Sequence, residues 1–290
     1  MKKFLLRFTF FIFSTVISYV ALYYSLTYFA LRKELSNTIY IYGDSQTVQG
    51  VDLNLLSSLT NLKVYSSARH GSGIYDFLFF TEKVPENSKI ILGISEHSQI
   101  RPNKFEANTS PLDFFTLKEL YHLDYPVSDL KLTIRKGLKP PFSSYFKTKH
   151  HLYPTLNTIN HHTSIESFIE RYSTITEQTL KKKQNMYLYG IQKLIEKNCA
   201  LTFIEFPYHY KLKNTVERTK FNYCFNDFKT NVKKKFSSYT IDTLFLESDR
   251  TLMYDYTHLN KLGAKILTQL LAHEIITTDE ETKYILFDTR

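Results

Sequence analysis

Cysteine and biased sequence are scarce in this chain, and their scarcity excludes several classes of protein. The 290 residues hold two cysteines, Cys199 and Cys224, which do not form a CxxC motif. Two thiols are too few for a disulfide scaffold or a zinc site, and they leave one disulfide or two free thiols open. Internal repeats and low-complexity tracts are also absent, which excludes a solenoid and a disordered chain.

Acidic residues are outnumbered by basic ones, and the formal net charge is +9 at pH 7. The excess is spread out, with short lysine clusters at 181–183 and 233–235. No zinc-finger spacing, basic zipper or aromatic RNA-binding pattern accompanies them, so we expect solvated basic faces near an anionic envelope and no nucleic-acid partner. The pairs His150-His151 and His161-His162 are adjacent rather than at i, i+4 spacing, so we expect no metal and no cofactor.

Charged residues are missing altogether between Phe8 and Leu31. A helix of about 24 residues rises about 36 Å, which is enough to span a bilayer core. More Lys and Arg precede this segment than follow it, which favours a cytoplasmic N-terminus and a periplasmic or extracytoplasmic remainder. No A-x-A-like cleavage site ends the segment, so we expect an uncleaved membrane anchor at residues 1–34 rather than a cleaved signal peptide.

Strand-like runs alternate with helical patterns in the remaining domain, residues 35–290. Continuous apolar runs such as "SKIILGIS" suit buried parallel strands, and the alternation predicts an α/β sandwich with a mostly parallel sheet. Residues 100–180 are rich in proline and polar residues and lack periodicity, so we interpret them as an insertion or lid carrying short helices. We expect strands at 38–42, 62–68, 88–95, 199–205 and 240–247, and helices at 53–59, 74–84, 176–198, 228–236 and within 255–275.

A serine directly follows the first expected strand, in Gly43-Asp44-Ser45. Glycine permits a tight turn that can present the hydroxyl at the edge of the sheet, where ligands of parallel sheets bind. A serine hydroxyl needs a neighbouring base to become a nucleophile. Taken alone, the tripeptide is also compatible with Asp44 and Ser45 capping the next helix.

A base and a carboxylate occur together near the other end of the domain, in Asp255-Tyr256-Thr257-His258. A carboxylate can fix the tautomer of a catalytic imidazole and stabilise the imidazolium, and an Asp three residues before a His can do so from one turn. The alternative is again capping, with Asp255 or Thr257 as the N-cap and His258 at the surface.

In combination, the two motifs resemble the SGNH, or GDSL, hydrolase superfamily. The blocks that carry the resemblance are "YGDSQTVQGVD" and "DYTHLNKLGAKIL", and it covers roughly residues 38–100 and 185–272. The resemblance implies a flavodoxin-like three-layer α/β/α sandwich. It also implies Ser45 as nucleophile, His258 as base and Asp255 as its partner.

The same resemblance implies an oxyanion hole built from Ser45 and two middle blocks. The glycine of the second block is Gly73 or Gly71 in "SSARHGSGIYD". The third block of the family is G-x-N-D, but here it is "LGISEHS", with Ser95 at the position of the Asn. The third donor is therefore Ser95, or His97 two residues on, or absent.

The departure at Ser95 and the anchor fit a divergent envelope branch of the superfamily, which resembles proteins that help to acylate alginate or teichoic acid. This branch implies an outward-facing esterase or O-acyltransferase on an acylated, most simply acetylated, glycan. A membrane-bound O-acyltransferase is then a candidate partner. Two alternatives stay open: a non-catalytic accessory or glycan-binding protein, and a lipase or thioesterase of the same superfamily. The aromatic run at 206–210 could line the cleft or serve packing.

Overall fold

A computed structural model of the protein describes residues 2–33, 38–100, 146–152, 165–173, 175–209, 212, 215–235, 239–241 and 250–280. The N-terminal helix and the sheet belong to separate units, and each is described by itself. Helix α1 (Lys2–Lys33) contains a stretch, Lys2–Leu22, with a mean hydropathy of 1.8. This stretch is long and apolar enough to cross a membrane. A signal sequence meets the same criteria, so the uncleaved anchor and its orientation stay predictions.

The centre of the second unit is a five-stranded, wholly parallel sheet with the order β2-β1-β3-β4-β5. This is the strand order of flavodoxin-like doubly wound folds, in which the chain switches direction between β1 and β3 and ligands bind beyond the carboxyl ends of those strands. The predicted fold class is therefore confirmed. The strands are β1 (Thr38–Gly43), β2 (Lys63–Ser66), β3 (Lys89–Gly93), β4 (Ala200–Ile204) and β5 (Tyr239–Ile241).

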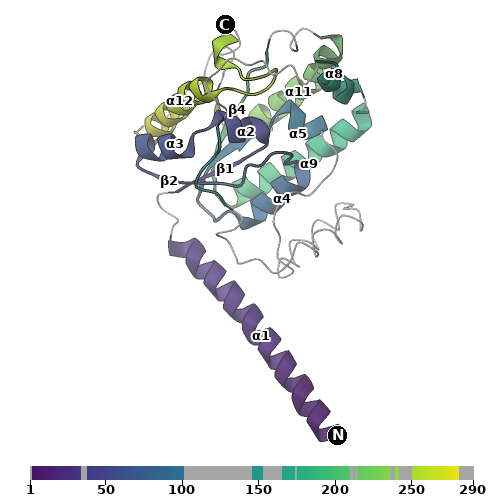
Figure 1. Ribbon diagram of the computed structural model, residues 1–290, viewed down its shortest axis with the longest axis vertical. Coiled ribbons are helices and arrows are strands. Elements are labelled where there is room, and N and C mark those ends of the chain that lie inside the picture. The colour runs from purple at the N-terminus through teal and green to yellow at the C-terminus, as the bar shows by residue number, and fades with distance from the viewer. Residues whose placement is uncertain are drawn as a thin grey trace. The chain divides into compact units, whose positions relative to one another are not determined.

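Helices cover both faces of the sheet, which makes three layers (Figure 1). Helices α2, α3 and α12 contact one another on one face, and α4, α5 and α9 form contacts on the other, where α11 also packs on α9. The helices of this unit, with one 3₁₀ turn, are α2 (Ser45–Gly50), α3 (Leu53–Thr60), α4 (Ile74–Lys83), α5 (Glu96–Ile100), α8 (Ile165–Ser173), α9 (Glu177–Glu196), α11 (Val216–Lys235), η4 (Arg250–Leu252) and α12 (Lys261–Glu280).

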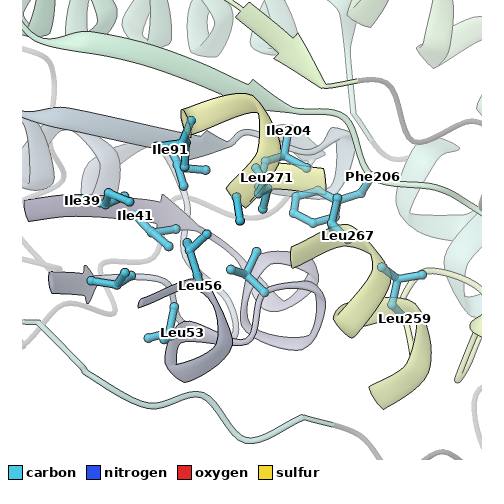
Figure 2. Close-up of a cluster of buried hydrophobic side chains, with 14 of the residues drawn as sticks. Ile39, Ile41, Leu53, Leu56, Ile91, Ile204, Phe206, Leu259, Leu267 and Leu271 are labelled. Carbon is cyan, nitrogen blue, oxygen red and sulfur yellow. The ribbon is translucent and has the colours of Figure 1, made fainter. Parts of the chain in front are cut away.

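Alternate side chains of β1 build the two halves of the core, because successive residues of a strand point to opposite faces. Ile39 and Ile41 join an aliphatic cluster with Leu53 and Leu56 of α3 and with α12 (Figure 2). Tyr42, on the other face, lies 5.0 Å from the ring of Phe77 in α4. Full burial of each such side chain contributes about 1.5–3 kcal/mol, so β1, which precedes the Gly-Asp-Ser motif, lies at the best-packed position of the sheet.

Most expected elements appear within a few residues of the predicted bounds, and the departures have physical reasons. Helix α2 was not expected, because its six residues, SQTVQG, lack a helical apolar pattern. All six are buried, so tertiary packing holds the helix. Helix α11 begins twelve residues before the predicted start, and only three residues of the last expected strand, β5, are described. Of the predicted insertion at 100–180, residues 101–145, 153–164 and 174 lie outside the described residues. Residues 242–247 of the last predicted strand also lie outside them. The described part of the insertion includes α8 and the start of α9.

A short segment, residues 147–152, contacts the edge strand β2. Lys147 exchanges backbone hydrogen bonds of 2.8 and 2.7 Å with Ser66, as in an antiparallel bridge. Downstream, the two ring nitrogens of His150 lie 2.9 Å from the carbonyl oxygen of Val51 and 2.9 Å from Ser66 Oγ. The carbonyl can only accept, so Nδ1 carries the hydrogen and Nε2 accepts from the serine.

A neutral imidazole fits this arrangement, because its Nε2 then has a lone pair for the Ser66 hydroxyl. Burial is the main cause that lowers the pKa of His150 to about 4, and the positive charges of Lys147 and His70 act in the same direction. The Val51 carbonyl and Asp52 oppose this shift. The edge of the sheet is therefore closed by a group that is uncharged at neutral pH.

Candidate active site

Ser45 is the first residue of α2, immediately beyond the end of β1. Asp44 is the N-cap of this helix: its Oδ1 accepts a hydrogen bond of 2.9 Å from the backbone N–H of Gln46. The capping alternative for this motif thus holds for Asp44, and it leaves the Ser45 hydroxyl available. Ser45 itself is buried, with 4% of its surface exposed.

Two glycines let α2 approach the sheet closely. Gly43 and Gly93 are paired neighbours on β1 and β3, and Thr47 of α2 lies over both. A Cβ atom at Gly43 would lie 1.8 Å from Thr47 Oγ1, and one at Gly93 would lie 2.0 Å from the same atom. Any side chain at either position would therefore displace α2, and with it Ser45.

His258 and Asp255 lie in a tight loop between η4 and α12. Asp255 Oδ1 accepts hydrogen bonds of 2.8 Å from the backbone N–H groups of both Thr257 and His258. Asp255 Oδ2 lies 2.8 Å from His258 Nδ1, and His258 Nε2 lies 2.9 Å from Ser45 Oγ. A carboxylate only accepts, so Nδ1 carries the hydrogen and the lone pair of Nε2 faces the Ser45 hydroxyl. The structure thus brings all three predicted residues into one hydrogen-bonded chain.

Asp255 stays ionised at neutral pH. Burial acts to raise its pKa, but the hydrogen bonds from the His258 ring and from the two backbone N–H groups outweigh it and hold the pKa below the usual value. An ionised carboxylate at this position stabilises a positive charge on the imidazole.

The rest of the "DYTHLNKLG" block has structural roles. Asn260 caps α12, because its Oδ1 accepts from the backbone N–H groups of Leu262 (2.9 Å) and Gly263 (3.1 Å). A Cβ at Gly263 would lie 2.5 Å from the carbonyl oxygen of Leu252. The block therefore fixes where the His258 loop ends and where α12 begins.

The predicted oxyanion donors are placed less simply. The N–H of Gly73 donates to Asp76 Oδ2 at 3.3 Å, because Gly73 is the N-cap of α4. The Ser95 hydroxyl donates to Asp44 Oδ2 at 2.6 Å. The alternative glycine, Gly71, has a φ of 87° in the same loop. The oxyanion roles of Gly73 and Ser95 stay predictions, and in this structure the hydrogens of both donors are directed to carboxylates.

His97, the other candidate donor, lies in an aromatic environment. It is buried in α5, with its ring centroid 5.8 Å from that of Tyr172 and 5.9 Å from that of Tyr208. Tyr208 belongs to the aromatic run after β4, which is buried rather than exposed to a glycan. The described residues of this run, 206–209, are all buried, which favours the packing alternative.

Gln46, Tyr208 and His209 also contact the site. The sequence did not identify Gln46 as a functional residue, whereas Tyr208 and His209 belong to the aromatic run that it named as a possible lining of the cleft. Gln46 Nε2 donates to the carbonyl oxygen of Thr257 at 2.8 Å, and the Tyr208 hydroxyl donates to Gln46 Oε1 at 3.4 Å. The N–H of His209 donates to the carbonyl oxygen of Tyr256 at 3.0 Å. A glutamine after Gly-Asp-Ser carries no sequence signal of this kind, because its partners lie far away along the chain.

The remaining expectations concern metals and cysteines. Within the described ranges, no group of three or more His, Cys, Asp or Glu side chains is placed to hold a metal ion. Cys199 and Cys224, both among the described residues, are free thiols. Of the two alternatives left open by the sequence, the structure has the unpaired one.

Comparison with known proteins gives structural similarity alone. No family model and no curated protein matches the chain. Among solved structures, a lipase from a goat rumen metagenome is 13% identical, with a TM-score of 0.43, covering 82% of this chain and 97% of that one. An α/β hydrolase enzyme from the metagenome of Lake Arreo, Spain, is 12% identical (TM-score 0.41; 83% and 96% covered). An acetyl xylan esterase variant from Geobacillus stearothermophilus is 14% identical (TM-score 0.41; 83% and 95% covered). Identities and TM-scores of this size do not place the chain in a family.

Proposed function

We propose that the chain is a membrane-anchored, outward-facing serine esterase or O-acyltransferase of the SGNH type, which acts on an acetylated envelope or extracellular glycan. The observation that carries the proposal is the hydrogen-bonded chain from Ser45 Oγ through His258 to Asp255, with separations of 2.9 and 2.8 Å. A nucleophile, a base and an orienting carboxylate in this geometry are the parts that acyl transfer through serine requires.

The chemistry follows from these contacts. Ser45 Oγ attacks the ester carbonyl carbon while its proton passes to His258 Nε2, and Asp255 stabilises the imidazolium. The tetrahedral intermediate collapses, the ester C–O bond breaks, and His258 returns the proton to the departing sugar oxygen. An acyl group remains on Ser45. Water or a sugar hydroxyl, deprotonated by His258, then attacks the acyl carbon, the bond from that carbon to Ser45 Oγ breaks, and His258 returns the proton to Ser45 Oγ.

The developing oxyanion needs donors that are not already engaged. The backbone N–H groups of Ser45 and Gly71 donate no hydrogen bond within the described part of the chain. Gly71 belongs to the loop in which the N–H of Arg69 donates to the carbonyl oxygen of Gly43, two residues before Ser45. We assign the oxyanion to these two backbone donors.

The acceptor decides between the two versions of the reaction. Water makes the protein an esterase, and a second sugar hydroxyl makes it a transferase. In the transferase version, a membrane-bound O-acyltransferase would supply the acyl group. The non-catalytic alternative would be favoured if Ser45 Oγ and His258 Nε2 lay out of hydrogen-bond reach, and their separation of 2.9 Å supports the catalytic proposal instead.

The test uses the full chain in detergent. We expect an activated acetyl ester to be hydrolysed, acetyl transfer to be measured with an acetylated glycan and a sugar acceptor, and Ser45→Ala and His258→Asn to lose the activity. Ser58→Ala is a matched control, because this exposed serine donates only to the carbonyl oxygen of Leu55 in α3. Equal rates for wild type and Ser45→Ala would overturn the proposal. A preference for long acyl chains would favour the lipase or thioesterase alternative.

A further inference from the structure

The side chain of Gln46 lies between three separate parts of the chain. Gln46 follows Ser45 in α2 and is buried, with 1% of its surface exposed. Its Nε2 donates to the carbonyl oxygen of Thr257 in the His258 loop at 2.8 Å. Its Oε1 accepts from the Tyr208 hydroxyl, which comes from the segment after β4, at 3.4 Å. The carbonyl oxygen can only accept, so the amide must present its NH₂ group to Thr257.

The bond to Thr257 acts on the peptide group that carries His258. The carbonyl oxygen of the Thr257–His258 peptide is held by Gln46, and its N–H is held by Asp255 Oδ1 at 2.8 Å. A peptide group is planar, so fixing both its oxygen and its hydrogen fixes its orientation. The Cα of His258 follows this plane directly, and the imidazole can then take few positions.

A second contact holds the preceding peptide. The N–H of His209 donates to the carbonyl oxygen of Tyr256 at 3.0 Å, and the two rings meet edge to face with centroids 5.4 Å apart. The segment after β4 therefore supports the His258 loop through His209 and orients the Gln46 amide through Tyr208.

We propose that Gln46 is a positioning residue, which sets the distance between the Ser45 hydroxyl and the His258 ring by clamping the Thr257–His258 peptide to the helix of the nucleophile. The inference rests on the proposed function for its kinetic consequence. Gln46 does not touch the reacting atoms. Gln46 follows Ser45 in the chain, and its side chain binds the carbonyl oxygen of Thr257, the residue before His258.

Three variants of the full chain test the clamp, with kcat expressed per active site titrated by a fluorophosphonate. Gln46→Met keeps the length of the side chain but cannot donate, and we expect kcat to fall about 10- to 100-fold with little change in KM, since a misplacement of about 1 Å can cost about 100-fold. Tyr208→Phe removes the hydroxyl that supports the amide, and we expect a loss of about 2- to 10-fold, the size of one neutral hydrogen bond. In the Gln46→Met background, Tyr208→Phe should have no further effect, because its partner is gone.

A fourth variant distinguishes positioning from a general structural role by its pH profile. In Gln46→Glu, an ionised carboxylate faces the carbonyl oxygen of Thr257 and cannot donate. Protonation at lower pH restores a donor of the same size. We therefore expect the ratio of wild-type to variant kcat to decrease as pH falls. A ratio that is constant with pH would contradict the clamp.

The control is Gln184→Met. Gln184 is also a buried glutamine whose Nε2 donates to a backbone carbonyl oxygen, that of Cys224, and to Gln99 Oε1, both at 3.1 Å. We expect it to lower the melting temperature about as much as Gln46→Met does, without lowering kcat per active site. Equal kinetic losses in the two variants would overturn the proposal.

Hydrogen–deuterium exchange gives a readout that does not need activity. We expect Gln46→Met, but not Gln184→Met, to speed exchange in residues 253–260 while β1 stays unchanged. If exchange and kcat are both unchanged, the clamp is wrong, although Ser45-dependent turnover would still support the proposed function. If wild type has no Ser45-dependent turnover, the proposed function fails, and the exchange result alone supports or overturns the clamp.

Discussion

The role of Ser95 gives a sharp prediction, because the two interpretations of this residue differ in size and kind. Ser95 stands where the SGNH superfamily, which the sequence resembles, has an oxyanion-donating Asn, yet its hydroxyl donates to Asp44 Oδ2 at 2.6 Å. Asp44 is fully buried and caps α2. From this geometry we expect Ser95 to stabilise the N-terminal end of the nucleophile helix rather than to donate to the oxyanion.

Ser95→Ala leaves a buried carboxylate oxygen without this donor. A hydrogen bond to a charged group contributes about 1.5–3 kcal/mol, so we expect the melting temperature to fall by about 3–12 °C, at about 2–4 °C per kcal/mol. The rate constant for acyl transfer should fall less than about tenfold, whereas loss of an oxyanion donor costs about 100- to 1,000-fold. Ser98→Ala is the neighbouring control, because its hydroxyl donates to a neutral group, the backbone carbonyl oxygen of Ser95, at 2.7 Å.

The assays are a thermal melt and steady-state hydrolysis of an activated acetyl ester by the full chain in detergent. A loss of kcat by 100-fold or more in Ser95→Ala, with an unchanged melting temperature, would refute this reasoning. It would instead place the Ser95 hydroxyl in the oxyanion hole during turnover.

Three further outcomes are expected. Gly93→Ala should destabilise the fold by about 1–3 kcal/mol and lower activity. Adding Thr47→Ala should partly rescue the Gly93→Ala variant, because it removes the clashing Oγ1. It should not rescue Gly43→Ala, because the Cβ of residue 47 would still lie 2.5 Å from the new Cβ at position 43. The His150 pKa of about 4 lies below the unfolded value of 6.5. The contribution of neutral His150 to the free energy of unfolding is therefore complete above pH 6.5 and is lost as the pH falls towards 4. Urea titrations should show a loss of about 2 kcal/mol between pH 7 and 5 that is absent in His150→Asn, and an identical slope in that variant would contradict the assignment. Asp255→Asn should lower kcat by about 1,000- to 10,000-fold without unfolding the protein, as circular dichroism would show, and a loss below tenfold would argue against its role.

The fold could be predicted from the sequence because its signals are local. Buried strands such as 89–93 are continuous apolar runs, and helices such as 177–196 have a start signal at Thr176, whose hydroxyl accepts from the N–H of Thr179. Helix α2 has no such pattern: it forms because Gly43 and Gly93 let Thr47 lie on the sheet.

The site could be predicted only in part for a related reason. Ser45 and His258 belong to short sequence motifs that occur in a fixed order along the chain, and such motifs can be recognised from the sequence alone. The partners of Gln46 lie 162 and 211 positions away, and the direction of the Ser95 hydroxyl depends on Asp44, 51 positions earlier. Contacts of this kind arise only when the strands of the sheet bring distant segments to one edge.

The most direct test of the central claim is mass-spectrometric identification of the residue that a fluorophosphonate modifies in the full chain. We predict a single covalent adduct on the peptide containing Ser45, absent in Ser45→Ala and formed much more slowly in His258→Asn. No adduct on Ser45, or labelling at the same rate when His258 is replaced, would contradict the account of Ser45 as a nucleophile activated by His258 and Asp255.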